Sequence, residues 1–494
     1  MSKILGISAG FHDACASVID TDGNILFAGH SERYSHVKND KNFCDGLRAE
    51  LSHWEYDTIA YYEQPLLRQL RAIKSGERFD KSWTVRRALK NQLGPDLRGA
   101  KIDSYHHHLS HAAAGFQTSP FNSAVVAVID AIGELDTISI YYAYYDCENG
   151  KARYQRMWSQ SYPHSIGLFY SAITDRVGLK PLDEEYITMG MAAWGTSKLD
   201  QDMMKYAVSN VKESTFKHNF HIGIEEDVFA GESNEDIAHA AQYVTENLID
   251  NVLKRAQNLA YTTNLVLMGG VALNCVANSR IGRYFPRIWI MPNPGDGGSS
   301  LGAAALAYGK KLNWTTPFLG YDIQGEYPVQ GLISELLTTK IVGVANGRAE
   351  FGPRALGNRS LLADPRGAEI KDKVNEIKRR QKFRPFAPVI LAEHASDYFD
   401  MPFGWESSPY MQAVAKCKRP DLFPAIVHVD DTSRVQTVDI SDNSGIRKLL
   451  EEWYRLTGCP MLLNTSLNIR GEPMVNTRED ADRFENLYGI RVLS

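Results

Sequence analysis

Two stretches of the chain share one design, in which an apolar strand leads through a glycine loop into a helix. The first is NLVLMGGVALNCVANSRI, with Gly269, Gly270 and Asn274; the second is IWIMPNPGDGGSSLGAAALAYG, with Gly295 and Gly297. In both, the glycines let backbone N–H groups approach a ligand at the helix start, where the helix dipole favours a phosphate. Neither loop has the Walker A or dinucleotide-binding spacing. We therefore predict an α/β fold in which these residues take part in nucleotide binding, without a P-loop or a Rossmann domain.

The amino-terminal sequence adds a strand, a tight loop and a hairpin. An apolar run, KILGIS, is followed by the runs CASVID and ILFAGH, with Asp22-Gly23 between these two. Asp-Gly in that position is a strong hairpin signal. The order resembles the beginning of actin-like ATPase folds, whose first loop lies in the central cleft. On that basis His12 and Asp13 are candidate catalytic residues. The alternative is that they are only a loop pair joined by local hydrogen bonds.

The stretch YHHHLSHAAAGF contains His107 and His111, spaced i, i+4 in a run that continues as a helix through three alanines. This spacing places both imidazoles on one face of the helix. Two carboxylates from loops after apolar strands would complete a site: Asp130 in VVAVIDAIGE and Asp296 in MPNPGDGG. Two histidines and two aspartates with open positions suit a catalytic divalent metal. The alternative is that the histidines are only packed beside an Ala-rich helix.

The length of the chain predicts more than one domain, because 494 residues are too many for a single hydrophobic core. The connection WTTPFLGYDIQGEYPVQ predicts the boundary, with domains at residues 1–325 and 326–494. The 6 cysteines are scattered without a Cys-x-x-Cys pair, so neither a disulfide framework nor a zinc–cysteine site is expected. The sequence has no signal-peptide pattern and no run of about eighteen apolar residues. We therefore expect a cytoplasmic protein without a membrane segment.

Residues 346–388, at the start of the second domain, are rich in arginine separated by turn glycines and prolines. A solvated charge run is not spaced in that way, and Arg suits bidentate recognition of phosphate, so we predict a phosphate pocket. PAIVHVDDTSRVQTV adds His428 and an arginine, and PMLLNTSLNIRGEP ends a strand in groups that can donate hydrogen bonds to an oxyanion. Asn and Ser after a strand are also common turn formers. The candidate residues for this pocket are Arg348, Arg354, Lys378, Arg380, Arg384, Arg434, Asn464, Thr465 and Ser466.

The segment from Leu66 to Lys101 is also basic and contains Trp83 among its charges. Such a mixture can hold a nucleic-acid backbone or stack a base. The alternative is a solvated helical face. The formal net charge of -5 does not by itself indicate a polyanion partner.

Characteristic blocks follow one another along nearly the whole chain. In chain order they are ILGISAGFHDA, HHLSHAAAGF, MGMAAWG, LMGGVALNCVAN, PGDGGSSLGAA, GRAEFGPRALGNRSLLADPR, KFRPFAP, HVDDTSRVQTV and LLNTSLNIRGEP. In these blocks the chain resembles the O-carbamoyltransferases that modify nodulation factors and antibiotics, and the GPRALGNRS and LLNTS motifs are highly specific.

This resemblance implies two modules. An actin-like domain, similar to that of the tRNA threonylcarbamoyl-transfer proteins, would hold a metal, usually Fe(II), at the two histidines and two aspartates named above. A YrdC-like domain would use ATP with Mg(II) and carbamoyl phosphate to form carbamoyl-adenylate, for which a pocket rich in guanidinium and amide donors is suited. An alcohol would then take the carbamoyl group in the metal domain, and His12 or His428 would move the proton.

Several positions depart from the family pattern. Ala131 stands where Gly usually follows the aspartate, and Ile187 stands where lysine is usual in Gly-Glu-x-Lys. Asp431 and Ser433 stand where Gly and Ala are usual. Because these positions lie near presumed ligand contacts, they bear on the identity of the acceptor and on the placement of the nucleotide.

We therefore predict an ATP-dependent O-carbamoyltransferase that uses carbamoyl phosphate as donor. The prediction is compatible with a homodimer. The hydroxyl acceptor would be a sugar- or antibiotic-type small molecule or 5-hydroxymethylcytosine in DNA. One alternative is a tRNA threonylcarbamoyl-transfer enzyme, which would depend on threonine. Another is a non-catalytic nucleotide-binding scaffold, in which the Arg and His clusters would be idle.

Overall fold

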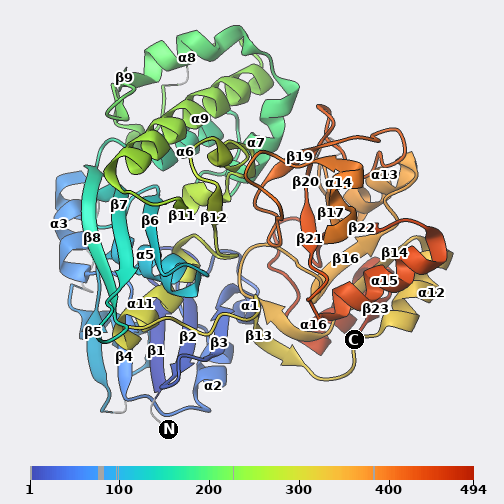
Figure 1. Ribbon diagram of the computed structural model, residues 1–494, viewed down its shortest axis with the longest axis horizontal. Helices are drawn as coiled ribbons and strands as arrows, with labels where there is room; N and C mark the ends of the chain where they lie inside the picture. Colours follow the sequence, from blue (N-terminus) through green and yellow to red (C-terminus); the bar gives the residue numbers. More distant parts are fainter. Residues whose placement is uncertain (1–2, 76–82, 96, 98, 226, 382–383) are drawn as a thin grey trace. The chain divides into compact units, whose positions relative to one another are not determined.

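The computed structural model describes residues 3–75, 83–95, 97, 99–225, 227–381 and 384–494 (Figure 1). The chain forms two compact units, and the main change from one to the other falls between Thr316 and Pro317, inside the connection WTTPFLGYDIQGEYPVQ. The separation into a transfer domain (1–325) and an adenylating domain (326–494) stays a prediction. The first unit consists of Met1–Ser35, Asn39–Ala277 and Arg283–Thr316, and the second of His36–Lys38, Asn278–Gly282 and Pro317–Ser494.

A five-stranded sheet in the order β3-β2-β1-β4-β5 opens the first unit. β1, β2 and β3 pair antiparallel as a meander, and β4 and β5 continue the sheet parallel to β1. Gly23, in the turn between β2 and β3, has a φ of 85°, which fits the predicted Asp-Gly hairpin. The strands are β1 (Lys3–Ser8), β2 (Cys15–Asp20), β3 (Ile25–His30), β4 (Thr58–Tyr61) and β5 (Lys101–Ser104).

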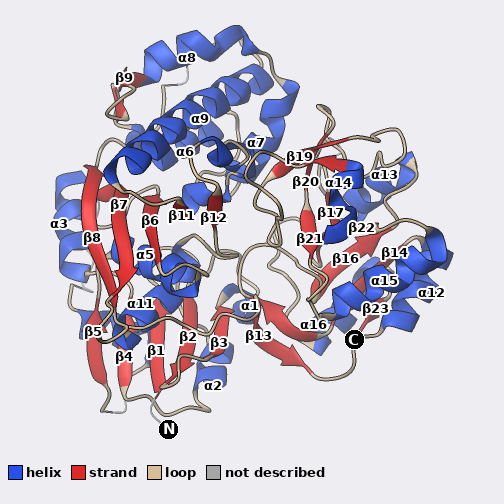
Figure 2. Cartoon of the chain, in the orientation of Figure 1, coloured by secondary structure: helices blue, strands red, loops and turns tan. Residues whose placement is uncertain are grey.

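The second five-stranded sheet repeats this plan in the order β12-β11-β6-β7-β8. Here β6, β7 and β8 form the antiparallel meander, and β11 and β12 run parallel to β6 (Figure 2). The predicted α/β class is therefore confirmed, and the unit contains the same mixed sheet twice. The strands are β6 (Ser123–Ile129), β7 (Asp136–Tyr145), β8 (Ala152–Ser161), β11 (Asn264–Met268) and β12 (Arg287–Trp289).

Two helices, α5 (His107–Thr118) and α11 (Ser299–Tyr308), pack against each other and link the two sheets. α11 lies on β1, β2 and β4, whereas α5 lies on β6 and β11. Glycines allow α11 to approach both α5 and β1 closely. A methyl group on Gly302 of α11 would lie 1.8 Å from the Ser110 carbonyl oxygen of α5, and one on Gly6 of β1 would lie 1.9 Å from the Ser300 carbonyl oxygen of α11. The close packing fixes the histidine-bearing helix relative to the ends of the strands.

Further helices complete the first unit, and the longest of them is α9 (Asn234–Leu259), whose N-terminus is capped by the Ser233 hydroxyl. No helix in the described ranges has the length and apolar character needed to cross a membrane. The other elements before the second unit are α1 (Glu32–Ser35), α2 (Asp45–Leu51), α3 (Pro65–Ser75), α4 (Val85–Leu93), α6 (Ile166–Arg176), α7 (Glu185–Met191), α8 (Asp200–Ala207), β9 (Val208–Asn210), β10 (Thr215–Phe216) and α10 (Cys275–Asn278).

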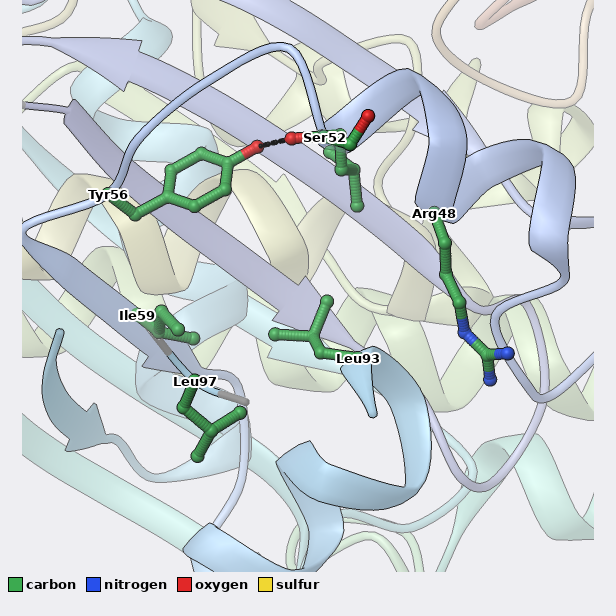
Figure 3. Close-up of a pocket in the computed structure, with 7 residues that line it drawn as sticks. Arg48, Ser52, Tyr56, Ile59, Leu93 and Leu97 are labelled. Atoms are coloured by element: carbon green, nitrogen blue, oxygen red, sulfur yellow. Dashed lines mark hydrogen bonds between the residues drawn. The ribbon is translucent and has the colours of Figure 1, made fainter. Parts of the chain in front are cut away.

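A pocket in the first unit is lined by residues of α2, β4 and α4 (Figure 3). Its wall is mostly apolar, with Leu51, Ile59, Leu93 and Leu97, and the Tyr56 hydroxyl donates a 2.6 Å hydrogen bond to the Leu51 carbonyl. None of the predicted site residues lines this pocket.

The second unit is built on a six-stranded sheet in the order β21-β17-β22-β16-β14-β23. Helix α15 lies on β17 and β22 and buries Trp453 completely. The strands are β13 (Phe318–Ile323), β14 (Ile341–Ala345), β15 (Gly347–Glu350), β16 (Arg359–Ala363), β17 (Ala387–Leu391), β18 (Phe399–Asp400), β19 (Val414–Cys417), β20 (Thr432–Arg434), β21 (Gln436–Val438), β22 (Met461–Ser466) and β23 (Val492–Leu493). The helices are α12 (Val329–Thr339), α13 (Ala368–Ile377), α14 (Ala395–Tyr398), α15 (Gly445–Thr457) and α16 (Arg478–Tyr488).

Arg359, the first residue of β16, is fully buried and holds several backbone segments of the second unit together. It belongs to the arginine-rich segment, but its guanidinium donates to backbone carbonyl oxygens, which shows a structural use. The acceptors are the carbonyls of Asn476 (3.1 Å), Asn346 (3.0 Å), Gly347 (3.0 Å), Asn358 (2.9 Å) and Tyr321 (3.0 Å).

Replacing Arg359 with leucine is expected to lower the free energy of unfolding by about 3–5 kcal/mol, because buried carbonyl groups would lose their donors. Urea unfolding of the full chain measures this change. Arg455→Leu is the matched control, since Arg455 is exposed and pairs with Glu452 on the surface. Equal stability of the two variants would contradict the structural use of Arg359.

Candidate functional site

Helix α5 presents His107 and His111 on one face, one turn apart, as their spacing predicts. Their Nε2 atoms lie 3.0 Å apart, and both side chains are buried. Two imidazole nitrogens at this distance need a shared proton or a cation, because their lone pairs would otherwise repel each other. The helix therefore directs two nitrogens to one point.

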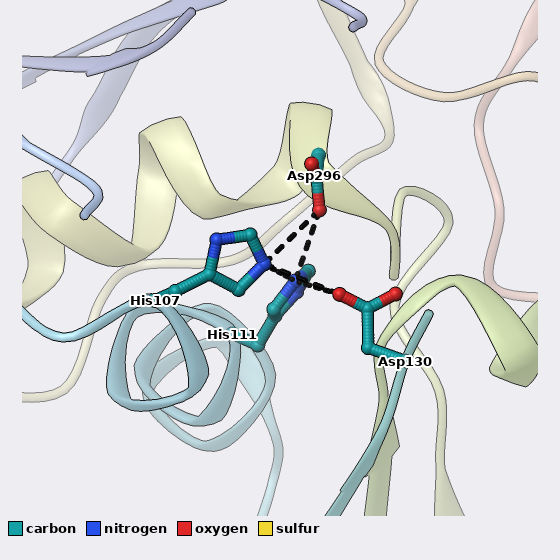
Figure 4. A group of neighbouring side chains, drawn as sticks. All are labelled: His107, His111, Asp130 and Asp296. Atoms are coloured by element: carbon teal, nitrogen blue, oxygen red, sulfur yellow. Dashed lines mark hydrogen bonds and ion pairs between the residues drawn. The ribbon is translucent and has the colours of Figure 1, made fainter. Parts of the chain in front are cut away.

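Asp130 follows β6, and Asp296 begins the short turn that leads into α11; both are buried and reach the two histidines (Figure 4). His107 Nε2 lies 3.2 Å from Asp130 Oδ2 and 3.2 Å from Asp296 Oδ1. His111 Nε2 lies 3.5 Å and 3.3 Å from the same two oxygens. One ligand atom from each residue lies within 4.8 Å of the others. The structure thus brings together the four residues of the predicted metal site, here called the His–Asp cluster.

The donor set of the His–Asp cluster fits a divalent metal. Two buried carboxylates are costly unless positive charge neutralises them. Two imidazole nitrogens and two carboxylate oxygens are donors that first-row divalent metals accept. The Nδ1 atoms of His107 and His111 have no hydrogen-bond partner within the described ranges, so each histidine directs only Nε2 into the cluster.

Opposite charges set the pKa values of the His–Asp cluster. Burial would raise the pKa of Asp130 and of Asp296, but hydrogen bonds and charge from the histidines outweigh it and hold both pKa values below the ordinary range. Burial would lower the pKa of His107 and of His111, but the two carboxylates raise both pKa values. The cluster therefore keeps its carboxylates ionised and attracts positive charge.

Glu134 was not identified from the sequence, yet it holds the start of α5. Its Oε1 accepts hydrogen bonds from the backbone N–H groups of His107 and Gln64, both at 2.9 Å. A carboxylate at a helix N-terminus is also favoured by the helix dipole. The only sequence signal was its place in VVAVIDAIGE, four residues after Asp130.

Replacing Glu134 with glutamine is expected to weaken metal binding about 10-fold, because partners that orient a ligand typically affect affinity by 10–100-fold. Competition with a coloured chelator measures the dissociation constant. Glu148→Gln, at an exposed turn residue, should leave the affinity unchanged. Equal affinity of the Glu134 variant and the native protein would show that Glu134 does not position the ligands.

His12 and Asp13 lie beside the His–Asp cluster. His12 Nδ1 lies 3.0 Å from Asp13 Oδ2, and His12 Nε2 lies 3.9 Å from Asp296 Oδ2. Burial opposes the charge on His12, but Asp13 and Asp296 raise its pKa to about 10. The side chain of His12 is 29% exposed, so it is accessible next to the cluster. The local pair is present, and its catalytic role stays a prediction.

The loop glycines have packing uses in the structure. Gly269 has a φ of 91°, and a methyl group there would lie 2.2 Å from the backbone of β6. The Gly270 N–H donates a 3.0 Å hydrogen bond to Asp130 Oδ1 and so holds this aspartate. Gly295 lies next to Gly270, and a methyl group on Gly297 would lie 2.8 Å from a buried sulfur atom. Their part in nucleotide binding stays a prediction.

Asn274 is engaged by Gln242 of α9. Asn274 Nδ2 donates to Gln242 Oε1 at 3.0 Å, and Gln242 Nε2 donates to Asn274 Oδ1 at 3.1 Å. The predicted contact of Asn274 with a nucleotide would therefore require this pair to open or to share its atoms with the ligand.

The positions that depart from the family pattern are accommodated locally. The Ala131 carbonyl accepts a 2.6 Å hydrogen bond from Ser165 Oγ, and Ile187 is buried. Ser433 Oγ donates to the Ile426 carbonyl at 2.7 Å, whereas Asp431 adopts a left-handed φ of 59°.

A second group of predicted residues meets around Lys378 in the second unit. Lys378 is buried, and its Nζ donates to Ser466 O (2.5 Å), Ser466 Oγ (3.1 Å) and Asn468 Oδ1 (2.8 Å), all uncharged. Burial, and then the charges of Arg380 and Arg384, lower the pKa of Lys378 well below its ordinary value. These five residues, here called the Lys378 cluster, bring positive charge together in a place suited to an anion.

Other predicted residues of the second unit are bonded within their own surroundings. Arg348 Nη2 donates to the Leu319 carbonyl at 2.6 Å, and Asn464 Nδ2 donates to Gln436 Oε1 at 2.8 Å. His428 Nδ1 accepts a 2.7 Å hydrogen bond from the next backbone N–H. The remaining candidates, Arg354, Arg434 and Thr465, are half-buried, and their part in ligand binding stays a prediction.

Known protein families match both parts of the chain. The family profile Carbamoyltransferase N-terminus matches residues 61–305, and Carbamoyltransferase C-terminus matches residues 333–494. The protein sll1178 of Synechocystis is 33% identical over 98% of this chain and 94% of its own length. The chain belongs to the carbamoyltransferase family. The predicted resemblance is thereby confirmed, and this carbamoyltransferase is an enzyme of the O-carbamoyltransferase type.

Nodulation proteins are among the relatives of this carbamoyltransferase. NolNO of Sinorhizobium fredii is 28% identical over 95% of this chain and 76% of its own length. NolO of Bradyrhizobium diazoefficiens is 30% identical over 76% of this chain and 75% of its own length. Among solved structures, component A of the Acidaminococcus fermentans (R)-2-hydroxyglutaryl-CoA dehydratase covers 62% of this chain at a TM-score of 0.37 and 16% identity. The family assignment therefore depends on the sequence relatives.

Proposed function

We propose that this carbamoyltransferase uses ATP with Mg(II) to convert carbamoyl phosphate into carbamoyl-adenylate in its second unit, and transfers the carbamoyl group to a hydroxyl in its first unit. The observation that carries the proposal is the His–Asp cluster, whose four ligand atoms lie within 4.8 Å of one another. The repeated sheet plan supports an actin-like first unit. A YrdC-like second unit is part of the same proposal and rests on the sequence blocks.

The reaction has a defined balance. Carbamoyl phosphate and water would give carbamate and phosphate, and carbamate would attack the α-phosphorus of ATP and expel pyrophosphate. The acceptor oxygen would then attack the carbamoyl carbon and release AMP. The products are the carbamate ester, AMP, pyrophosphate and phosphate, which gives each half of the reaction its own assay.

In the first unit, His107, His111, Asp130 and Asp296 would hold the metal, for which we propose Fe(II). When bound, a divalent metal supplies Lewis-acid polarisation of an oxygen ligand, worth several kcal/mol. His12 lies beside Asp296, and Asp13 would orient its ring through Nδ1. Because the pKa of His12 is about 10, its Nε2 must first lose a proton, after which it would take the proton of the acceptor hydroxyl.

In the second unit, the Lys378 cluster would hold the donor. Carbamoyl phosphate is small, anionic and labile, so a buried lysine beside arginines suits it better than an open basic surface. The Ser466 hydroxyl lies 3.1 Å from Lys378 Nζ and could donate to the same oxyanion.

For the acceptor, we propose a small-molecule hydroxyl in preference to 5-hydroxymethylcytosine in DNA. Two arginines of the basic segment face inward: Arg68 Nη1 donates to Glu63 Oε1 at 2.7 Å, and Arg71 Nη1 donates to the Gly133 carbonyl at 2.9 Å. Trp83 and the basic residues of α4 are exposed, whereas Arg78, Lys81 and Arg98 lie outside the described residues. The described contacts thus reduce the charge that the segment offers to a nucleic-acid backbone.

The proposal is tested with carbamoyl phosphate labelled in its carbonyl carbon. The enzyme, loaded with Fe(II) and supplied with ATP and Mg(II), should transfer the label to a member of a panel of sugars and aminoglycosides, with AMP released in equal amount. DNA containing 5-hydroxymethylcytosine is the parallel arm, and label in DNA would reverse the choice of acceptor. Label transfer without ATP, or a requirement for threonine, would contradict the proposal.

A further inference from the structure

A buried network of three side chains lies beside the turn that carries Asp296. Cys15 begins β2 and His30 ends β3, and the two residues face each other in the antiparallel register of these strands. Cys15 Sγ lies 3.1 Å from His30 Nδ1, and His30 Nε2 lies 3.2 Å from Asn293 Nδ2. The exposed fractions are 0% for Cys15, 6% for His30 and 4% for Asn293. The three residues, here called the Cys–His–Asn network, take no part in the reaction steps proposed above.

The hydrogen bonds of the Cys–His–Asn network have a defined direction. An amide nitrogen can only donate, so Asn293 Nδ2 donates to His30 Nε2, and the neutral ring then carries its hydrogen on Nδ1, next to Cys15 Sγ. Burial, and then the charge of Arg33, lower the pKa of His30 to about 3, so the ring is neutral at neutral pH. Buried polar groups are costly unless they are paired, and here each partner comes from a different segment of the chain. The network therefore has one preferred arrangement.

Gly297, the residue after Asp296, packs directly on this network. A methyl group on Gly297 would lie 2.8 Å from Cys15 Sγ and 2.9 Å from Asn293 Nδ2. It would also lie 3.1 Å from His30 Cε1. The first two separations are shorter than real side-chain contacts, so only glycine fits here without a shift of its neighbours. The backbone of the turn thus rests directly on the three side chains.

The carbonyl group of Gly297 is also held from β2. It accepts a 2.8 Å hydrogen bond from Ser300 Oγ, which in turn lies 2.8 Å from Ser17 Oγ. Both serines are fully buried. Cys15 and Ser17 are two residues apart in β2, so they share one face of the strand. β2 therefore fixes Gly297 at two points.

The position of Gly297 bears on the metal site because Asp296 precedes it and points toward the two histidines (Figure 4). Asp296 Oδ1 lies 3.2 Å from His107 Nε2 and 3.3 Å from His111 Nε2. The aspartate side chain is short, so a shift of the turn backbone would move its carboxylate relative to the histidines. Groups that orient a metal ligand typically change the affinity for the metal by about 10–100-fold.

From these contacts we infer that the Cys–His–Asn network positions Asp296 as a metal ligand by fixing the turn at Gly297. The inference rests on the proposed function, because it requires a divalent metal at the His–Asp cluster. It adds to that function three positioning residues that act through Asp296. The alternative is that the network only stabilises the fold, which would leave the geometry at the metal unchanged.

The first test uses Co(II) as the probe in the full-length protein, because the visible absorption of Co(II) depends on the number and arrangement of its ligands. His30→Leu removes both hydrogen bonds of the ring and should weaken Co(II) binding about 10-fold. Its absorption bands at saturating Co(II) should differ from the native bands. His30→Gln, which can still pair with Asn293, should recover most of the affinity and the native bands. Native affinity and native bands in His30→Leu would overturn the inference.

A matched pair of glycine substitutions tests the contact at Gly297 without removing a polar group. Gly297→Ala places a methyl group against the network and should weaken Co(II) binding about 10-fold. Gly190→Ala, where an added methyl group meets no atom within 4 Å, should keep the native affinity and the native bands. Equal affinity of these two variants for Co(II) would overturn the inference.

Thiol reactivity in the native protein gives a measurement that does not depend on a folded variant. Cys15 is fully buried, so iodoacetamide should reach it only when the turn opens. A Co(II) concentration about 10 times the dissociation constant should slow this alkylation about 10-fold, as followed by mass spectrometry. Cys275, also buried in the first unit, is the control. No slowing at Cys15, or equal slowing at both cysteines, would overturn the inference.

The proposed function fails separately from this inference. Native protein that binds neither Co(II) nor Fe(II), or that transfers no label from carbamoyl phosphate, would contradict the proposed function. Native protein that binds Co(II) and transfers the label, together with variants of unchanged affinity, would contradict only the positioning role of the Cys–His–Asn network.

Discussion

Protein in which His111 is replaced with alanine is expected to lose its bound metal and to transfer the carbamoyl group about a thousandfold more slowly. The change removes one of two imidazoles whose Nε2 atoms lie 3.0 Å apart and leaves two buried carboxylates with less compensating charge. The Lewis-acid contribution that depends on the metal is worth several kcal/mol, or about three powers of ten in rate. Metal analysis of purified protein and label transfer to the acceptor measure the two effects.

The matched control for this variant is His106→Ala. His106 precedes α5 and is exposed, so the same substitution there should leave both metal content and transfer unchanged. Pyrophosphate release should persist in the His111 variant, because the Lys378 cluster lies in the other unit. Full transfer activity without bound metal would show that the His–Asp cluster has no catalytic use.

Replacing Lys378 with methionine is expected to reduce pyrophosphate release about 100–1,000-fold, the range found when one preorganised donor to an oxyanion is removed. Methionine keeps most of the apolar volume of the lysine stem but none of its three hydrogen bonds to Ser466 and Asn468. Metal content should be unchanged, because none of the metal ligands lies in this unit. Loss of metal, or near-native pyrophosphate release, would contradict the assignment of Lys378 to donor binding.

The pH dependence of the same residue has a definite sign. Burial and the nearby Arg380 and Arg384 lower the pKa of Lys378, so the free enzyme loses this charge at a lower pH than an ordinary lysine would. The KM for carbamoyl phosphate should therefore rise as the pH increases through that lowered pKa. In Lys378→Arg the charge persists, and the rise should move to higher pH or disappear.

Local patterns predicted the four residues of the His–Asp cluster because each is fixed by a short stretch of chain. The i, i+4 spacing of His107 and His111 sets their common face before any tertiary contact forms. Asp130 and Asp296 follow strands β6 and β12, which belong to the same sheet, so the ends of that sheet bring them near each other. The hairpin and the strand–loop–helix units were predictable for the same local reason.

Tertiary hydrogen bonds decided what the sequence left open. The nucleotide-binding role of Gly270 stays a prediction, and the fold adds that its N–H holds Asp130. Arg359 belongs to a basic run, and in the fold backbone carbonyls surround it. Glu134 belongs to no recognisable sequence motif, because its role in holding the start of α5 depends on backbone N–H groups from two other segments of the chain. Residue type shows which bonds a side chain can make, whereas the fold determines which buried groups remain to be satisfied.

The most direct test of a metal at the His–Asp cluster is an anomalous difference map, recorded at the iron edge, from crystals of the full chain grown with Fe(II) under reducing conditions. We predict the strongest peak between the Nε2 atoms of His107 and His111 and the carboxylates of Asp130 and Asp296. The account would be contradicted by a map with no peak there from protein that transfers the carbamoyl group, or by iron bound only elsewhere.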